Sequence, residues 1–142
     1  MKRRRSKILI GTATAASVTA VAILAAQRFG AAACTNRILT AVVSPDGRYK
    51  AVVFERDCGA TTDYSTQVSV LAASDELGRD GSNIFVADTA GGKAPSGPRG
   101  GPQVRRAWKA DEELFVGHHS AARIFRKEDR YRGVVVLYGV FE

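Results

Sequence analysis

The sequence is poor in the residues that build metal centres. Its 142 residues include only two cysteines, two histidines, one tryptophan and one methionine. Two cysteines without clustered histidines cannot form a four-ligand zinc site, so we expect no metal site and no cofactor. The chain is also too short for a barrel enzyme or a closed propeller, and its length predicts one folded domain.

Acidic residues are absent from the first 33 positions, which hold six of the 21 lysines and arginines. From residue 34 onward, 15 basic residues stand against 14 acidic ones, so the net charge of +7 belongs almost wholly to the N-terminus. A domain that is basic throughout would suggest a nucleic-acid partner. Because the folded part is nearly neutral, we expect no nucleic-acid partner.

One long apolar run follows the basic start. It begins at Ile8 and ends at Ala26, and its 19 residues carry no charge. A helix of this length spans roughly 30 Å, the thickness of the hydrocarbon core of a membrane. The basic flank predicts a cytoplasmic N-terminus. We therefore divide the chain into a signal or membrane-anchor segment, 1–33, with a transmembrane span at 8–26, and an extracytoplasmic domain, 34–142.

Three fates of this N-terminal segment stay open from the sequence. The interpretation favoured here is an uncleaved single-pass anchor in the cell membrane. Cleavage near Ala33 would instead release a secreted or periplasmic domain. Lipidation at Cys34 is the third fate, because residues 31–34 resemble a lipobox, although leucine is usual where Ala31 stands.

Cys34 and Cys58 are predicted to form a disulfide. Export would place them in an oxidising compartment, where pairing is expected. The loop they would close has about 25 residues, and the chain-entropy estimate of its stabilisation is roughly 3–4 kcal/mol. Two unpaired thiols are the alternative, and lipid on Cys34 would leave Cys58 without its partner.

Short β-rich runs separated by turn signals fill the rest of the chain. Ser44-Pro45-Asp46-Gly47 predicts a tight hairpin turn, because Pro45 fixes φ, Asp46 can bond its own backbone and Gly47 tolerates a positive φ. We expect an all-β fold, a small antiparallel β-sandwich or a bent meander of seven or eight short strands. The expected strands are 38–43, 48–55, 66–72, 83–88, 104–108, 113–118, 123–126 and 133–141.

The apolar positions of these runs define an expected core. It comprises Val43, Ala51, Val53, Val68, Val70, Ile84, Val86, Trp108, Leu114, Val116, Ile124, Val134, Val136 and Tyr138. Two segments interrupt the strands. The polar segment 73–81 is expected to form a loop or a single helical turn. Segment 89–102 holds five of the 14 glycines and three of the four prolines, so it is predicted to be a flexible loop.

Two stretches resemble known sequences. The Ser-Pro-Asp-Gly turn at 44–47 and the segment 108–114 resemble blade repeats of propeller proteins, although two units cannot close a propeller. The longer stretch 44–62, which ends in Arg56-Asp57-Cys58-Gly59-Ala60-Thr61-Thr62, together with 65–69 and 122–125, resembles an uncharacterised family of small bacterial exported or membrane-anchored proteins. That resemblance implies a bacterial, envelope-facing β-domain and carries over no catalytic residue.

The function expected from the sequence is non-enzymatic recognition of a protein or an envelope component, by a domain held at the membrane. Exposed loops of a β-domain carry such contacts, so the loops 56–64 and 89–102 are the expected interaction sites. The candidate contact residues in the first loop are Asp57, Thr61, Thr62 and Asp63.

Two alternative functions stay open. A small envelope enzyme, either thiol-dependent or a hydrolase, would use Cys58 with His118 or His119, which requires a thiolate and a base within hydrogen-bond reach. An inhibitor or immunity-type protein would be marked by a co-purifying partner. Because neighbours on a strand point to opposite faces, His118 and His119 are not expected to share a metal.

Overall fold

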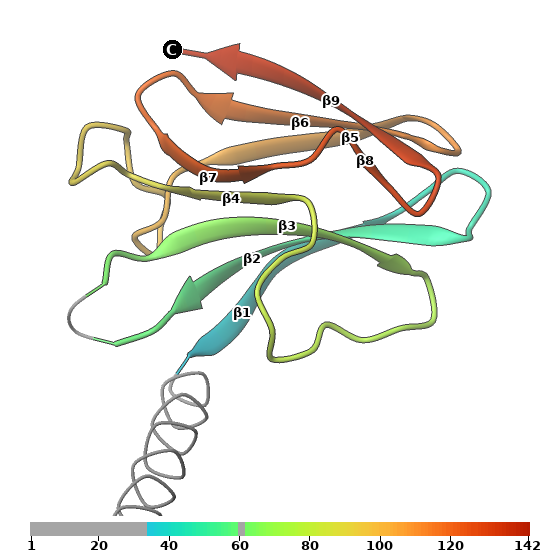
Figure 1. The fold of residues 1–142 in the computed structure, drawn as a ribbon, viewed down its shortest axis with the longest axis horizontal. Coiled ribbons are helices and arrows are strands. Elements are labelled where there is room, and N and C mark those ends of the chain that lie inside the picture. The colour runs from blue at the N-terminus through green and yellow to red at the C-terminus, as the bar shows by residue number, and fades with distance from the viewer. Residues whose placement is uncertain (1–33, 60–61) are drawn as a thin grey trace, which may run out of the picture. The chain divides into compact units, whose positions relative to one another are not determined.

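The computed structural model describes residues 34–59 and 62–142, which fold into nine strands in two sheets (Figure 1). The expected all-β class is confirmed, and the described residues contain no helix. The expected span at 8–26 lies outside the described residues. The strands are β1 (Thr35–Val43), β2 (Tyr49–Asp57), β3 (Ser65–Ala72), β4 (Phe85–Asp88), β5 (Val104–Ala110), β6 (Glu113–His119), β7 (Arg123–Lys127), β8 (Arg130–Tyr131) and β9 (Val134–Phe141).

The first sheet has five antiparallel strands in the order β1-β2-β3-β4-β7, and the second has four strands in the order β5-β6-β9-β8. The expected antiparallel pairing holds for every pair of neighbouring strands except β6 and β9, which run parallel. After β6 the chain crosses to the five-stranded sheet, adds β7 there, and returns. A parallel pair needs such a long crossover, whereas antiparallel neighbours need only a turn.

The predicted hairpin joins β1 to β2. The Gly47 nitrogen donates to the Ser44 carbonyl at 2.9 Å, and Gly47 has a φ of +76°. The Ser44 hydroxyl donates to Asp46 Oδ1 at 2.7 Å. This hydrogen bond and the neighbouring Arg48 guanidinium lower the pKa of the Asp46 carboxyl to about 2. The turn is therefore a small polar network, with its carboxylate held ionised.

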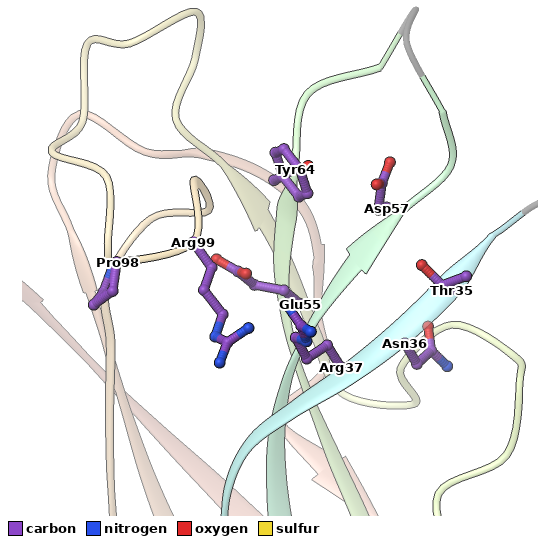
Figure 2. Close-up of a pocket in the computed structure, with 8 residues that line it drawn as sticks. All are labelled: Thr35, Asn36, Arg37, Glu55, Asp57, Tyr64, Pro98 and Arg99. Carbon is purple, nitrogen blue, oxygen red and sulfur yellow. The ribbon is translucent and has the colours of Figure 1, made fainter.

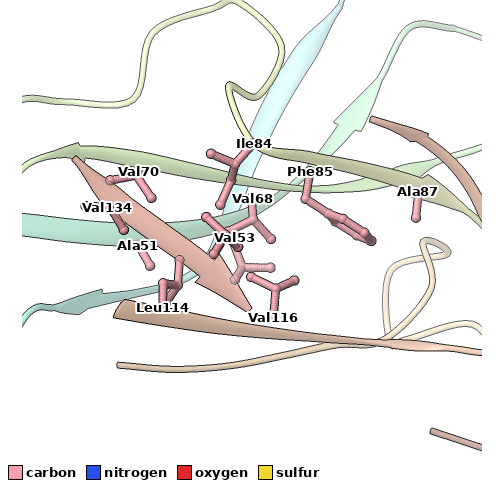
Figure 3. Packing of buried hydrophobic residues seen from close by; sticks show 11 residues of the cluster. Ala51, Val53, Val68, Val70, Ile84, Phe85, Ala87, Leu114, Val116 and Val134 are labelled. Atoms are coloured by element: carbon pink, nitrogen blue, oxygen red, sulfur yellow. The ribbon is translucent and has the colours of Figure 1, made fainter. Parts of the chain in front are cut away.

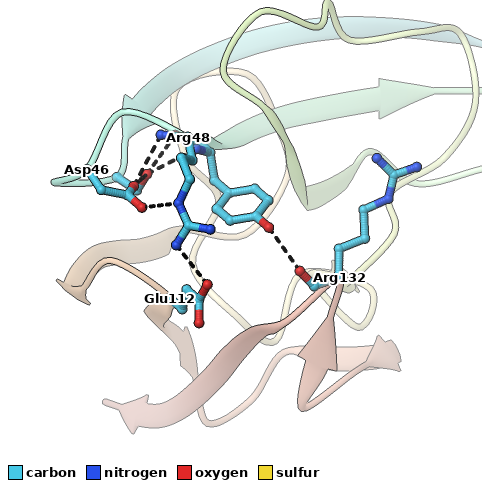
Figure 4. Close-up of polar contacts among 6 residues, drawn as sticks. Asp46, Arg48, Glu112 and Arg132 are labelled. Atoms are coloured by element: carbon cyan, nitrogen blue, oxygen red, sulfur yellow. Dashed lines mark hydrogen bonds and ion pairs between the residues drawn. The ribbon is translucent and has the colours of Figure 1, made fainter.

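The same turn connects the two sheets (Figure 4). Arg48, which is ion-paired with Asp46, also donates from Nη2 to Glu112 Oε1 at 2.7 Å, in the turn between β5 and β6. The hydroxyl of Tyr49 donates to the Arg132 carbonyl at 3.1 Å, in the turn before β9. These contacts hold the turn end of the sandwich closed.

Side chains from both sheets form one apolar core between them (Figure 3). Most of the expected core is confirmed, with Trp108, Ile124 and Tyr138 packed against it in partly buried positions. Two residues that were expected in the core lie outside it. Val43 is 52% exposed at the end of the edge strand, and Val86 is only half-buried. Strand β4 begins at Phe85, later than expected, so Phe85 and Ala87 are the residues that enter the core.

The outer face of the five-stranded sheet also buries apolar residues. Val52 and Phe54 are fully buried, although they alternate along β2 with the core residues Ala51 and Val53. The segment between β3 and β4 is tied to this sheet by Asn36, whose Nδ2 donates to the carbonyls of residues 78 and 80 at 2.9 and 2.8 Å. The segment 73–81 is therefore a loop, without the alternative helical turn.

Candidate functional site

Both cysteines are disulfide-bonded, and they are the only two in the chain, so the predicted Cys34–Cys58 bond is confirmed. The register of the hairpin explains the pairing. Thr35 lies opposite Asp57 in the β1–β2 ladder, so the next residue on each side is a cysteine. The bond closes the open end of the hairpin and fixes the start of the loop that follows β2.

The Cys–His arrangement considered for an enzyme is not assembled as a thiol site, because the sulfur of Cys58 is in the disulfide. The ring of His118 stacks on the buried Phe85 at 5.7 Å between centroids, whereas His119 meets Phe141 edge-on at 5.8 Å. The two imidazoles thus have separate aromatic partners. Among residues 34–59 and 62–142, no three His, Cys, Asp or Glu side chains are grouped to hold a metal ion.

The two loops expected to carry contacts meet at one end of the sandwich and line an open cavity of about 780 Å³ (Figure 2). We call this cavity the loop-end pocket. Asp57, the last residue of β2, and Tyr64, in the loop that follows it, line this pocket, and the Gly/Pro-rich loop contributes Pro98 and Arg99. The remaining lining residues come from β1 and β2; they are Thr35, Asn36, Arg37 and Glu55.

The carboxylate of Glu55 is fixed at the inner side of this pocket. Glu55 is only 5% exposed, and its Oε1 accepts a hydrogen bond of 2.8 Å from the backbone nitrogen of Gly101. Across the sheet it lies between Arg37 on β1 and Thr66 on β3. Glu55 therefore joins the strands to the Gly/Pro-rich loop.

Two glycines allow that loop to approach the sheet so closely. A Cβ atom on Gly101 would overlap the Thr66 hydroxyl and lie 3.0 Å from Glu55 Oε1. A Cβ atom on Gly100, whose φ is +111°, would lie 2.8 Å from the ring of Tyr64. The loop is further closed on itself by a hydrogen bond of 2.8 Å from the nitrogen of Gly97 to the carbonyl of Gly101. Glycine at 100 and 101 thus brings the two loops together.

The pocket combines two guanidinium groups with two carboxylates. Arg37 and Arg99 are exposed, come from segments far apart in the sequence, and extend toward the same cavity (Figure 2). Glu55 and Asp57 supply the opposite charges. Planar guanidinium groups bind carboxylates through paired hydrogen bonds. Such a pocket can bind an anionic group at its arginines while its carboxylates accept hydrogen bonds from N–H donors.

A smaller cavity of about 260 Å³ continues from the loop-end pocket and shares Glu55, Pro98 and Arg99 with it. Its further lining is mainly apolar and includes Leu39, Val53, Pro102 and Val104. The two cavities form one groove between β1 and the loop that leads into β5. A polar compartment and an apolar compartment therefore lie next to each other along this edge of the sandwich.

Beyond this groove, β5 is connected directly to β1. Arg106 Nη2 donates to the Thr40 hydroxyl at 2.7 Å, and Trp108 Nε1 donates to the Val42 carbonyl at 2.9 Å. We call these two contacts the β1–β5 latch. The latch engages the second half of β1 and leaves residues 35–39 beside the groove.

The other predicted contact residues lie elsewhere. Thr62 and Asp63 line a separate cavity of about 490 Å³, together with Asp88 and Arg123. Burial acts to raise the pKa of Asp88, but the hydrogen bonds from Arg123 and from the Ala90 nitrogen, together with the charge of Arg123, lower that pKa overall. Thr61 lies outside the described residues. Of the predicted contact residues that the structure describes, only Asp57 belongs to the loop-end pocket.

Sequence reasoning did not single out Arg37, Glu55 or Arg99. One signal was available for Glu55, an acidic residue that continues the core-facing alternation of Ala51 and Val53 along its strand. No local signal marks Arg37 or Arg99, because their proximity arises from the loop-to-strand contact of Gly101 and Glu55.

Comparison with protein-family models, with curated proteins and with solved structures gave no match to this chain. Within the described residues, no helix combines the length and apolar character needed to cross a membrane.

Proposed function

We propose that this protein is a membrane-anchored, non-enzymatic recognition domain that binds a carboxylate-bearing protein or envelope component in the loop-end pocket. The observation that carries the proposal is the convergence of Arg37 and Arg99 on one cavity whose inner carboxylate, Glu55, is fixed by the Gly101 backbone. The Glu55 carboxylate meets a ligand already in place, which lowers the entropic cost of binding at that group.

The charge balance of the pocket supports a ligand with amide groups as well as a carboxylate. The two arginines would bind the carboxylate, and Asp57 would accept hydrogen bonds from N–H groups. Proteins and peptides carry both kinds of group.

An extracytoplasmic location is part of the proposal. It is supported by the basic start followed by the apolar run at 8–26 and by the Cys34–Cys58 disulfide, since disulfides persist in oxidising compartments. Intact-mass measurement of the membrane and soluble fractions tests it. A full-length mass in membranes is expected. Loss of about 33 residues would mean cleavage, an added diacyl mass would mean lipidation, and a full-length, reduced protein in the cytoplasm would refute the proposed location.

Binding is tested by NMR titration of the full-length chain in detergent micelles with N-acetylglutamate methylamide, which carries one carboxylate and two amides. Saturable shifts of the Arg37 and Arg99 side-chain resonances are expected. The double variant Arg37→Gln/Arg99→Gln should bind at least about a hundredfold more weakly, because it loses two charged hydrogen bonds worth roughly 1.5–3 kcal/mol each. The control variant Arg79→Gln/Arg130→Gln, which removes two exposed arginines outside the pocket, should bind normally. Absence of saturable shifts, or equal binding by both variants, would refute the proposed site.

A further inference from the structure

Strand β1 is an edge strand with one unpaired side. It pairs only with β2 among the described strands and stands at the end of the five-stranded sheet. The β1–β5 latch occupies Thr40 and Val42 in its second half. Residues 35–39 have no such contact from β5 and border the groove instead. The first half of β1 is therefore the part of this edge that is open to another chain.

This open half has only part of the usual protection of an edge strand. Natural edges are commonly blocked by proline, charged side chains such as lysine, or β-bulges, because unpaired backbone groups recruit further strands. Residues 35–39 contain neither proline nor lysine; their only charged side chain is Arg37, and the register shifts between Ile38 and Thr40. Ile38 and Leu39 are 54% and 42% exposed there, although both are large apolar residues. An added strand would cover these side chains and satisfy the backbone groups.

The charges around the open edge select the kind of partner. The groove is lined by three arginines, Arg37, Arg99 and Arg105. Its two acidic residues are Asp57 and Glu55, and Glu55 already accepts a hydrogen bond from the Gly101 nitrogen. The excess of positive charge favours an acidic segment. It disfavours a second copy of this chain, since antiparallel pairing of two such edges centred on Arg37 would place like charges opposite each other.

We propose that the partner is a protein that adds an extended acidic segment to residues 35–39, as a sixth strand of the sheet. This inference rests on the proposed function, because the acidic side chain of the segment binds Arg37 and Arg99 in the loop-end pocket. The next side chain on the same face, about 6.6 Å further along an extended strand, enters the apolar cavity beside Leu39 and Val53. Backbone pairing supplies affinity, and the two compartments supply specificity.

The test uses a ten-residue peptide of alternating threonine and valine with one central glutamate, acetylated and amidated, and the full-length chain in detergent micelles. Amide exchange of residues 35–39 is expected to slow when the peptide binds. Two further peptides separate the contributions. Replacing the central glutamate by glutamine should weaken binding about tenfold, since a charged hydrogen bond is lost. Methylating alternate backbone nitrogens should abolish slowed exchange and weaken binding by at least about tenfold, because strand pairing needs those N–H groups.

A matched pair of variants locates the binding edge. Ile38→Asp, in the open half, should abolish peptide binding, whereas Val43→Asp, at the latched end of the same strand and equally exposed, should leave it within about twofold. Unchanged circular dichroism and thermal midpoint of both variants show that they fold.

The outcomes distinguish this inference from the proposed function. If N-acetylglutamate methylamide and the peptide both fail to bind, the pocket proposal and the strand proposal fall together. If both bind, but the N-methylated peptide binds as well as its parent, strand addition is overturned and the pocket stands. Slowed exchange at 35–39 without peptide, accompanied by a doubled protein mass, would overturn the inference in favour of a second copy of this chain.

Discussion

Glu55 and Gly101, 46 positions apart in the chain, are joined by a hydrogen bond of 2.8 Å from the Gly101 nitrogen to Glu55 Oε1. This one contact sets the distance between the strand that carries Glu55 and the loop that carries Arg99. A shift of the Gly/Pro-rich loop would therefore also change the shape of the loop-end pocket.

Replacing Gly101 by alanine is expected to lower the free energy of unfolding by about 1–3 kcal/mol, the usual cost of overpacking. The added methyl would meet the Thr66 hydroxyl and Glu55, and the loop would have to move away. Urea denaturation followed by Trp108 fluorescence measures the change. Gly78→Ala is the control, since a Cβ there meets nothing within 4 Å. Equal stability of the two variants would show that the loop does not depend on this contact.

Glu55→Gln should keep an acceptor for the Gly101 nitrogen and remove the negative charge beside Arg37 and Arg99. We expect a stability loss of about 1 kcal/mol, because a charge-assisted hydrogen bond becomes a neutral one. Affinity for N-acetylglutamate methylamide should rise a few-fold, since the repulsion between two carboxylates is gone. Isothermal titration calorimetry measures the affinity. A fall in affinity would mean that Glu55 contacts the ligand as a required acceptor.

Reduction of the Cys34–Cys58 bond is expected to lower the free energy of unfolding by roughly 3–4 kcal/mol, the chain-entropy estimate for a loop of about 25 residues. Urea denaturation with and without a phosphine reductant measures the difference. In the variant Cys34→Ser/Cys58→Ser the reductant should have no effect. An equally stable reduced protein would contradict the prediction.

The stability of the Asp46 turn should depend on acid pH. The pKa of Asp46 in the folded protein is about 2, lowered from an ordinary value of 3.8 mainly by the hydrogen bond from Ser44 and then by Arg48. The ionised carboxylate thus favours the folded state above pH 4, and this contribution fades as the pH falls from about 4 to about 2. Thermal midpoints of wild type and Asp46→Asn should differ at pH 6 and converge near pH 2. A constant difference over this range would rule out the linkage.

Loss of the β1–β5 latch should loosen one half of β1 only. Trp108→Phe removes the donor to the Val42 carbonyl and should cost about 1 kcal/mol. Hydrogen exchange followed by NMR should then be faster in residues 40–43, while residues 35–39 keep their rates. Uniform acceleration along β1 would show that the two halves open together.

The sequence predicted the features that depend on near neighbours. The turn at 44–47 and the strands on either side of it follow from local residue types, and the Cys34–Cys58 bond was predicted from the expectation of export. Errors arose where distant segments decide the outcome. The parallel β6–β9 pair depends on the excursion of β7 to the other sheet, and the burial of Phe85 depends on where β4 begins. The loop-end pocket could not be predicted from the sequence for the same reason, because the contact of Gly101 with Glu55 joins residues that share no sequence pattern.

The disulfide at the end of the hairpin also has a mechanical consequence. The chain enters the described domain at Cys34, so any tension on the N-terminal segment arrives at that residue. Through the bond to Cys58 the load passes at once to β2 as well as to β1. The β1–β2 ladder cannot then be unzipped pair by pair from its open end, and pulling must shear it. A protein tethered at its N-terminus would thereby keep its edge strand in place under force for as long as the two sulfurs remain oxidised.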